Sequence, residues 1–270
     1  MTAKGLGIFG IGLLLAATAM MHAPGRPATT SITPREHGPM RLHAPDIGGT
    51  HSENWAGYAV TGKDFTYANG SWHVPQVDCT KTPDTFSSFW VGLDGFSDAT
   101  VEQIGTESDC SGTTAKYYAW YQLYPAGQVV LGNFPVSPGN KIGAQVQVNV
   151  DGDFIFHIEN FTTGQDFTTT QSAPGAKRTS AEWIAEAPSN TKGGIEPLAD
   201  FGRANYGKDY NASDPDSCIA TDSTITNGPI AAYGADVQKI IMFSSTNVVE
   251  AVPTALTPDG AAFRVNWKAE

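Results

Sequence analysis

Short runs of β-branched and aromatic residues, separated by glycine, proline, asparagine and aspartate, dominate this chain from about residue 50 onward. Such runs are typical of β-strands, and Asp151-Gly152 and Asp259-Gly260 are dipeptides that favour tight turns between strands. Eleven runs predict strands: NWAGYAV, TYANGSWHV, SSFWVGLD, VEQIGTES, KYYAWYQLY, KIGAQVQVNV, FIFHIENFTT, SAEWIAEA, LADFGRANY, QKIIMFSS and AFRVNW. One open sheet rarely carries so many strands. The sequence therefore predicts an all-β protein, a two-sheet antiparallel β-sandwich of the concanavalin or jelly-roll type.

The N-terminal region has the composition of a removable segment in two parts. Lys4 precedes a stretch from Gly5 to Ala19 without an ionisable side chain, and small residues follow, as in secretory signal peptides. Residues 20–51 are rich in proline and contain three arginines but almost no apolar pattern, so they cannot bury a core of their own. We expect a signal peptide over residues 1–19, an extended leader over 20–51 and one β-sandwich domain over 52–270.

The predicted domain is strongly acidic. It holds 12 Lys and Arg against 25 Asp and Glu, a net charge of −13, compared with −11 for the whole chain. A surface this negative repels nucleic acids and anionic membranes, so we expect neither as a partner. It also suits an acidic medium, in which protonation of carboxylates relieves self-repulsion. Together with the signal peptide, these features predict a secreted, extracellular protein, which we expect to be a monomer.

Three cysteines in an exported chain indicate one disulfide and a third thiol. Three pairings are open. We favour Cys79–Cys110, because these two residues flank one predicted hairpin region. Cys218 has Asp214, Asp216 and Asp222 nearby in the sequence, and negative neighbours disfavour a thiolate nucleophile.

Several predicted strands put aromatic and polar side chains on one face, because residues two apart point the same way. These sets are Ser88, Trp90, Gly92 and Asp94; Val101, Gln103 and Gly105; Tyr118, Trp120, Gln122 and Tyr124; and Glu182, Ile184 and Glu186. A dry core would not hold this mixture, and a plain solvent face would not use so many tryptophans. The pattern favours a substrate groove across a sheet. The alternative is an ordinary hydrated face with some exposed aromatic rings.

Most familiar catalytic arrangements lack their residues here. His73 and His157 are the histidines left in the domain, with no paired-histidine motif or cysteine cluster for a metal. There is no Gly-x-Ser-x-Gly turn for a serine nucleophile and no Asp-Thr/Ser-Gly motif for a pair of aspartates. Carboxylates, amides and tyrosines are left for acid–base chemistry.

Two other functions stay open from the residues alone. A sandwich-fold glycoside hydrolase also places two carboxylates in a concave sheet. Glu182 and Glu186 are four residues apart on one strand, roughly 13 Å, whereas glycosidases need about 5 to 9.5 Å between carboxyls. Glu182 with an acid from a neighbouring strand would still satisfy that requirement. The second alternative is a non-catalytic carbohydrate-binding module that uses the aromatic rings alone.

Six segments, in order, resemble the glutamic peptidases, also called eqolisins: SENWAGYAV, SFWVGLDG, VEQIGTES, YAWYQLYP, NFTTGQ and AEWIAEAP. They extend from Ser52 to about Phe201. The resemblance implies a sandwich of two curved antiparallel sheets and an acid endopeptidase that pepstatin does not inhibit. It implies that the leader is a propeptide, and the chain a zymogen. No metal or organic cofactor is implied, and the expected substrates are unfolded proteins or peptides.

The same resemblance assigns a site. The catalytic pair is Gln103, in the VEQIG segment, and Glu186, the second glutamate of AEWIAE. The substrate-binding residues we expect are Trp55, Trp90, Asp94, Trp120, Gln122 and Tyr124. Two positions depart from the family pattern, since Gln122 stands where members carry an acid and Tyr118 takes a place where an acid can occur.

The implied chemistry is consistent with these residue types. Peptide hydrolysis needs an activated water, a stabilised oxyanion and a proton for the leaving nitrogen. Glu186 is suited to take the proton of the water and give it to the amine. The side chain of Gln103 offers an NH₂ donor for the oxyanion and a carbonyl that orients the water. Glu182, on the same face, is expected only to support the site.

Overall fold

The computed structural model describes residues 33–43, 49–208 and 217–268. Contacts divide the chain into a unit up to Thr33 and a unit from Pro34 to Glu270, and the second unit holds all the strands of the described residues. These strands are β1 (Thr50–Ser52), β2 (Trp55–Thr61), β3 (Tyr67–His73), β4 (Ser88–Leu93), β5 (Val101–Ser111), β6 (Thr114–Tyr124), β7 (Val129–Val130), β8 (Lys141–Val148), β9 (Phe154–Asn160), β10 (Gln165–Gln171), β11 (Ser180–Glu186), β12 (Arg203–Tyr206), β13 (Ile219–Thr221), β14 (Gly228–Pro229), β15 (Val237–Phe243), β16 (Val249–Pro253) and β17 (Phe263–Trp267). A 3-10 helix, η2 (Ile230–Asp236), precedes β15. The predicted signal peptide lies outside the described residues.

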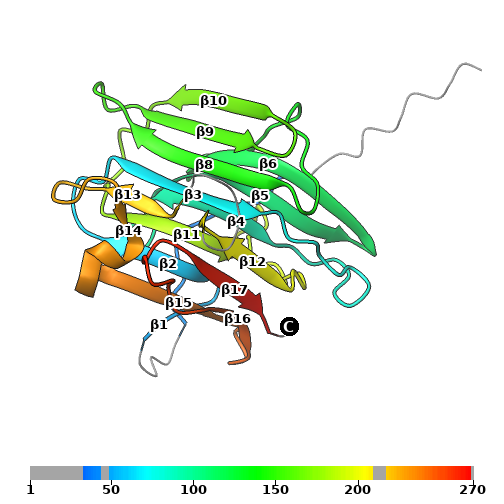
Figure 1. Ribbon diagram of the computed structural model, residues 1–270. Coiled ribbons are helices and arrows are strands. Elements are labelled where there is room, and N and C mark those ends of the chain that lie inside the picture. The colour runs from blue at the N-terminus through cyan, green and yellow to red at the C-terminus, as the bar shows by residue number, and fades with distance from the viewer. Residues whose placement is uncertain (1–32, 44–48, 209–216, 269–270) are drawn as a thin grey trace, which may run out of the picture. The chain divides into compact units, whose positions relative to one another are not determined.

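The strands form two layers (Figure 1). The first sheet has the order β1-β15-β2-β11-β4-β5-β6-β7 and is antiparallel except for the parallel pair β1–β15. The second has the order β10-β9-β8-β3-β12-β17-β16, with β13 beside β3 and β14 beside β13. Because β16 also pairs with β15, the two sheets are joined along one edge. The predicted all-β, two-sheet antiparallel architecture is confirmed.

The apolar core lies between the sheets, and hydrogen bonds from buried side chains cross it. The indole of Trp72 on β3 donates to Thr106 Oγ1 on β5 at 2.9 Å. The indole of Trp183 on β11 donates to the carbonyl of Asn69 on β3 at 2.8 Å, and the hydroxyl of Tyr206 on β12 donates to the carbonyl of Ile184 at 2.6 Å. These buried donors are satisfied across the two layers, which fixes β5 and β11 against the second sheet.

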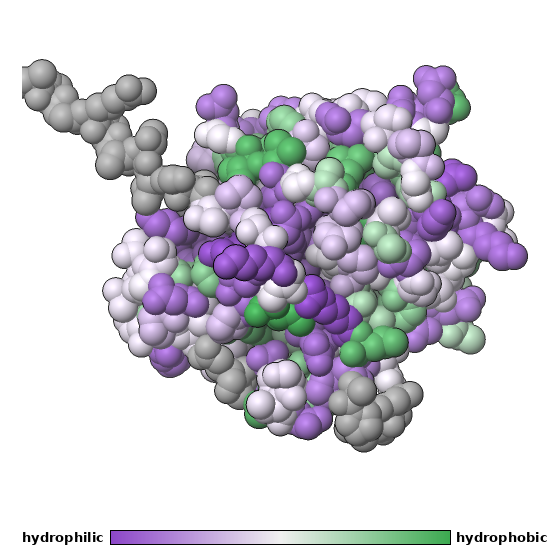
Figure 2. Space-filling model, turned by 180° about the vertical axis from the view of Figure 1, so that it is seen from behind, coloured by the Kyte–Doolittle hydropathy of each residue, from purple (hydrophilic) through white to green (hydrophobic). Residues whose placement is uncertain are grey.

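The outer face of the first sheet, the side that points away from the second sheet, carries a separate apolar cluster. It consists of Trp55, Ala59, Trp90, Val101, Tyr118, Trp120, Ile184 and Ile240, all of them buried. Part of their cover comes from the leader, because Met40 packs against the cluster and His37 stacks on Trp120. Figure 2, seen from the side opposite to Figure 1, shows strongly hydrophilic residues beside small hydrophobic patches.

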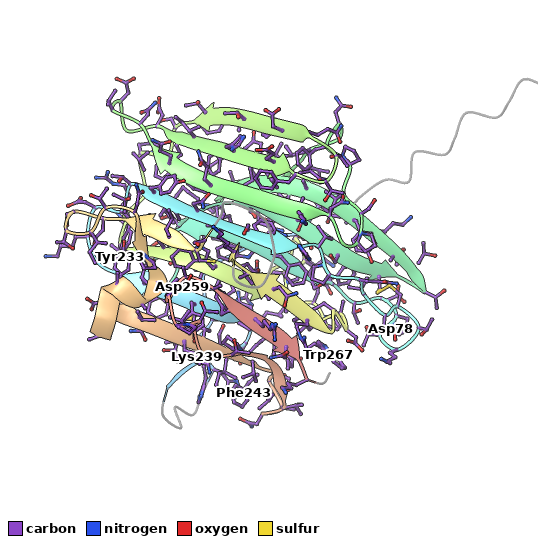
Figure 3. The ribbon with its side chains drawn as sticks, in the orientation of Figure 1. Asp78, Tyr233, Lys239, Phe243, Asp259 and Trp267 are labelled. Atoms are coloured by element: carbon purple, nitrogen blue, oxygen red, sulfur yellow. A yellow bond between two sulfur atoms is a disulfide. The ribbon has the colours of Figure 1, made fainter. Side chains whose placement is uncertain are left out.

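The C-terminal part of the leader contacts β15. The ring of His43 stacks on that of Phe243 with centroids 5.2 Å apart, and His43 Nε2 lies 2.9 Å from Asn247 Oδ1. Phe243 and Lys239 mark the course of β15 in Figure 3. Strand β1 pairs with β15 over Thr50–Ser52, so it crosses the predicted boundary between residues 51 and 52. The boundary itself stays a prediction.

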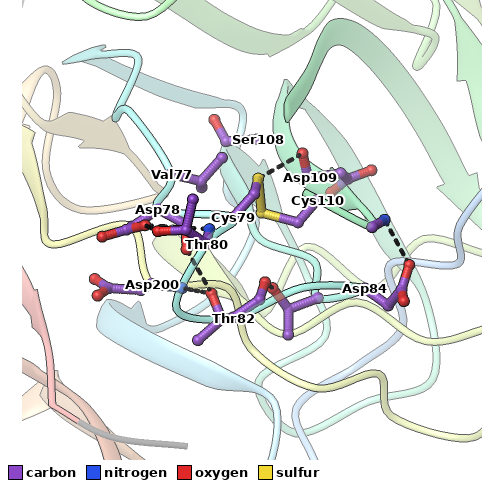
Figure 4. Close-up of a disulfide and its surroundings, with 12 residues drawn as sticks. Val77, Asp78, Cys79, Thr80, Thr82, Asp84, Ser108, Asp109, Cys110 and Asp200 are labelled. Atoms are coloured by element: carbon purple, nitrogen blue, oxygen red, sulfur yellow. Dashed lines mark hydrogen bonds between the residues drawn. A yellow bond between two sulfur atoms is a disulfide. The ribbon is translucent and has the colours of Figure 1, made fainter. Parts of the chain in front are cut away.

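Cys79 and Cys110 form a disulfide, with Cα atoms 5.3 Å apart, as the sequence favoured (Figure 4). It ties the loop after β3 to the end of β5, where Cys110 is the last residue but one. Beside it, the carboxylate of Asp84 accepts a hydrogen bond from the amide of Gly112 at 2.6 Å, which also holds that loop on the β5–β6 hairpin. Cys218 is buried and lies outside the disulfide. Within the described residues, no helix is long and apolar enough to cross a membrane.

Candidate active site

Four neighbouring strands of the first sheet, β11, β4, β5 and β6, build the polar part of the outer face. Their register places residues in three rows across the sheet: Glu182, Gly92, Gln103 and Gln122; Ile184, Trp90, Gly105 and Trp120; and Glu186, Ser88, Glu107 and Tyr118. Side chains directly opposite one another in a sheet share a face. The polar–aromatic sets derived from alternation thus meet on one surface.

Trp90 reaches across this surface because its neighbour on β5 has no side chain. A Cβ on Gly105 would lie 2.5 Å from Cβ of Trp90, too close for any residue but glycine. The indole of Trp90 points to Glu186, where its Nε1 donates to Oε2 at 2.8 Å. Trp55 supports this ring edge-on, with centroids 5.0 Å apart and planes at 76°. Two of the expected site tryptophans therefore position the carboxylate of Glu186.

Glu186 is fully buried at the end of β11. Besides Trp90, its Oε2 contacts His37 Nδ1 at 2.9 Å, while Oε1 has no hydrogen-bond partner among the described residues. Burial raises the pKa of this carboxyl, and the contacts with His37 and Trp90 pull the pKa the other way. A carboxyl with a raised pKa and one open oxygen is suited to exchange a proton.

Gln103 lies on β5, two strands away from Glu186, yet both side chains contact the same leader residue. The amide Nε2 of Gln103 donates to the carbonyl oxygen of His37, and its Oε1 has no partner among the described residues. The residues expected to be catalytic are thus brought together on one peptide segment.

Three further residues expected in the site contact leader residues 36–38. Trp120 stacks on the ring of His37, with centroids 3.7 Å apart and planes at 6°. Gln122 Oε1 accepts from the amide of His37 at 2.9 Å, and its Nε2 donates to Glu36 at 2.8 Å. The ring of Tyr124 lies beside Gly38, where an added Cβ would be 3.5 Å from it.

Asp94 is held differently. Its carboxylate accepts three backbone hydrogen bonds of 2.7–2.8 Å from the amides of residues 177–179. The structure therefore shows it anchoring the loop before β11, and its expected role in substrate binding stays a prediction.

Sequence reasoning missed three residues of this surface. Glu107 Oε1 lies 2.8 Å from His37 Nε2, and burial raises the pKa of Glu107 to about 8. Gln128 Nε2 lies 2.8 Å from the same ring nitrogen. Glu107 was accessible to the alternation argument, since it follows Gln103 by four residues on one strand. No local pattern marks His37 or Gln128.

The surrounding carboxyl groups are also buried. Burial raises the pKa of Glu182, four residues before Glu186 on β11. Burial together with the negative charge of Asp94 raises the pKa of Glu102 to about 9. Within the described residues, no group of three or more His, Cys, Asp or Glu side chains is arranged to hold a metal ion.

Fold and site together define a β-sandwich protein in which an amide and a carboxyl side chain converge on a bound peptide segment. The Peptidase A4 family model matches residues 53–249. This chain therefore belongs to the Peptidase A4 family, and the glutamic peptidase expected from the sequence is confirmed.

Two curated relatives agree with this assignment. The chain is 27% identical to aspergillopepsin-2 of Aspergillus niger over 211 residues, 70% of this chain and 71% of the relative. It is 30% identical to scytalidopepsin B of Scytalidium lignicola over 187 residues, 66% of this chain and 70% of the relative.

Solved structures share the fold. Scytalido-glutamic peptidase with a transition state analogue inhibitor has a TM-score of 0.65 at 22% identity, covering 80% of this chain and 98% of that one. Aspergilloglutamic peptidase from Aspergillus niger has a TM-score of 0.52 at 24% identity, covering 68% of this chain and 99% of that one.

Proposed function

We propose that this protein is a secreted endopeptidase of acidic media that cleaves peptide bonds with Gln103 and Glu186. One observation carries the proposal: both side chains contact a single residue of a peptide segment, Gln103 at its carbonyl oxygen and Glu186 at its side chain. The substrate class follows from what the site already holds, which is an extended stretch of polypeptide. A solved relative is described in complex with the tripeptide Ala-Ile-His, which supports peptides as substrates here.

In the proposed reaction Glu186 takes a proton and later returns it, while Gln103 stabilises the intermediate. The oxygen of a water attacks the carbonyl carbon of the peptide bond, and Glu186 takes a proton from that water. Gln103 Nε2 donates to the carbonyl oxygen as it becomes negative, which stabilises the tetrahedral intermediate. The carbon–nitrogen bond then breaks, and Glu186 returns the proton to the leaving nitrogen. Trp90 holds Glu186 in place through its hydrogen bond to Oε2.

Raised pKa values suit the proton transfers of the proposed reaction. Burial raises the pKa of Glu186, so its ionised form is a stronger base toward the water than an exposed glutamate, and the carboxyl holds the proton until the nitrogen leaves. Glu107 shares the surface and its pKa is raised as well. Neighbouring carboxyls that stay protonated avoid mutual repulsion.

We also propose that the leader is a propeptide and that the chain leaves the cell as a zymogen. The signal-like residues 1–19 support export, and the contacts of His37 with both proposed catalytic side chains support blockage of the site. The trimmed protein is expected to act as a monomer on unfolded chains.

Hydrolysis of denatured casein tests the proposal. After incubation in acid, we expect cleavage at about pH 3 to exceed cleavage at about pH 7, and pepstatin to leave both rates unchanged. N-terminal sequencing of the active species should show that residues before about 52 have been removed. Hydrolysis of a β-glucan with no cleavage of casein would support the glycoside hydrolase instead. Full activity of the untrimmed chain would contradict the zymogen.

A further inference from the structure

The leader residues 35–41 bind across the outer face in a single, well-anchored path. Glu36 exchanges two backbone hydrogen bonds with Ser189, at 2.9 and 2.8 Å. At the other end, the amide of Met40 donates to the carbonyl of Gly95 and the amide of Arg41 donates to Asn54 Oδ1. Between these anchors the side chain of His37 is fully buried.

The backbone of His37 is held as the substrate residue of the proposed reaction would be. Its carbonyl oxygen accepts from Gln103 Nε2, and its amide donates to Gln122 Oε1. The peptide bond between His37 and Gly38 thus lies at the group proposed to stabilise the oxyanion. A peptide segment placed this way is expected to be cleaved, unless another group blocks the carboxyl of Glu186.

The ring of His37 provides that obstacle. It lies flat on Trp120, its Nδ1 contacts Glu186 Oε2 at 2.9 Å, and its Nε2 contacts Glu107 Oε1 at 2.8 Å. Gln128 closes the pocket at Nε2. One flat surface and a carboxyl group at each ring nitrogen match the shape and the hydrogen-bonding edges of an imidazole. A phenyl ring would fill the space but would leave both buried carboxyls without these contacts.

We propose that Trp120, Glu107, Gln128 and Glu186 form a pocket for an imidazole ring, and that His37 uses it to make the leader an inhibitor and not a substrate. This inference rests on the proposed function, because inhibition has meaning only for a peptidase. It adds a ligand class that the proposed reaction does not require: imidazole itself, and peptides in which a histidine occupies the position of His37.

The test uses the full-length chain with His37→Ala, which empties the pocket but leaves the backbone contacts. Initial casein hydrolysis, measured before any trimming, is expected to rise at least about tenfold, because two buried hydrogen-bonding contacts of the leader are lost. Added imidazole should then bind saturably to His37→Ala by calorimetry and return its activity toward that of the wild type. His43→Ala, the matched leader variant, should stay as inactive as the wild type and bind no imidazole.

The outcomes separate the pocket from the function. Imidazole binding to His37→Ala without peptidase activity under any condition would support the pocket and contradict the proposed function. Activity of His37→Ala with no imidazole binding would overturn the pocket and leave the function intact. His37→Phe, which keeps a stacked ring and should fold if the smaller variant does not, should be uninhibited as well. If the His37→Phe chain hydrolysed casein as slowly as the untrimmed wild type, the proposed role of the imidazole would be overturned.

Discussion

The carboxyl group of Glu186 has two oxygens in different surroundings, and this difference bears on its role. Oε2 accepts from the indole of Trp90 and contacts His37, whereas Oε1 has no partner among the described residues. One oxygen is fixed in direction by its two partners, while the other has no hydrogen bond. Gln103 shows the same division, with Nε2 engaged and Oε1 open. Two half-satisfied polar groups on one buried surface are the arrangement expected of a reaction site.

Substitution of these two side chains tests their roles directly. Gln103→Glu replaces an amide donor by an acid of the same size, and Glu186→Gln removes the proton-transfer group. Each should lower kcat by at least about 10², the scale of a lost oxyanion donor or general base. Glu182→Gln on the same strand should be much milder. Initial rates on one peptide, with circular dichroism as a check on folding, measure this. An inactive Glu182→Gln variant together with an active Glu186→Gln variant would move the catalytic carboxyl from Glu186 to Glu182, four residues earlier.

Trp90→Phe should change the pH profile more than the fold. The indole donor stabilises the ionised form of Glu186 and so lowers its pKa. Without the donor the pKa of Glu186 should rise further, and the limb of the pH–rate profile that reports Glu186 should move to higher pH. We expect kcat to fall about tenfold.

The matched control is Trp72→Phe, which also loses an indole hydrogen bond, but in the core between the sheets. It should lower stability by about 1–3 kcal/mol and leave the pH–rate profile unchanged. Equal pH profiles for Trp90→Phe and the wild type would argue that Trp90 does not position Glu186.

At the scale of strands, the sequence was most informative where a run of residues was long. All eleven predicted runs contain a strand, because alternating β-branched and aromatic residues signal strands. Six strands were missed: β1, β7, β10, β13, β14 and β16. Strands β1, β7, β13 and β14 have two or three residues, too few for any period to show. Strand β10 lies at a sheet edge and exposes every second residue, with threonine and glutamine where a core strand has apolar side chains.

Contacts between distant segments are what no local pattern encodes. His37 and Glu186 are 149 residues apart, and the leader between Arg35 and Leu42 contains no regular element. Its path is set by partners on the finished sheet, such as Ser189 and Asn54. The pair Gln103 and Glu186 could be named from family resemblance, and Glu107 from alternation. The segment that covers them required the folded structure.

The disulfide joins two elements and should contribute to stability. It closes a loop with a sequence separation of 31, for which chain entropy gives about 3–4 kcal/mol. The double variant Cys79→Ala/Cys110→Ala should lose this amount, measured by urea unfolding. Reductant in the same experiment should destabilise the wild type similarly and have no effect on the double variant. A wild-type midpoint in the double variant would contradict the prediction.

Over the whole molecule, buried acids link stability to pH. Glu102, Glu107, Asp109, Glu182 and Glu186 all have raised pKa values, with burial as the largest cause. At a pH between the unfolded and folded pKa of such a group, the folded chain holds a proton that the unfolded chain has lost. The free energy of unfolding therefore falls as pH rises, by about 1.4 kcal/mol per pH unit for each group. The negative net charge adds self-repulsion in the same direction.

Glu102 allows this link to be measured one proton at a time. Its pKa is raised from 4.5 to about 9. Its contribution to the fall in the free energy of unfolding should therefore extend over that pH window. It should be absent in stronger acid, where the group is protonated in both the folded and the unfolded state. Glu102→Gln keeps the shape and cannot ionise. Urea midpoints measured across the window should fall less steeply for this variant than for the wild type, by the slope of one proton. Asp151→Asn, at an exposed turn, should keep the wild-type slope. Equal slopes for Glu102→Gln and the wild type would show that Glu102 is already ionised in the folded protein, and the acid stability would then need another source.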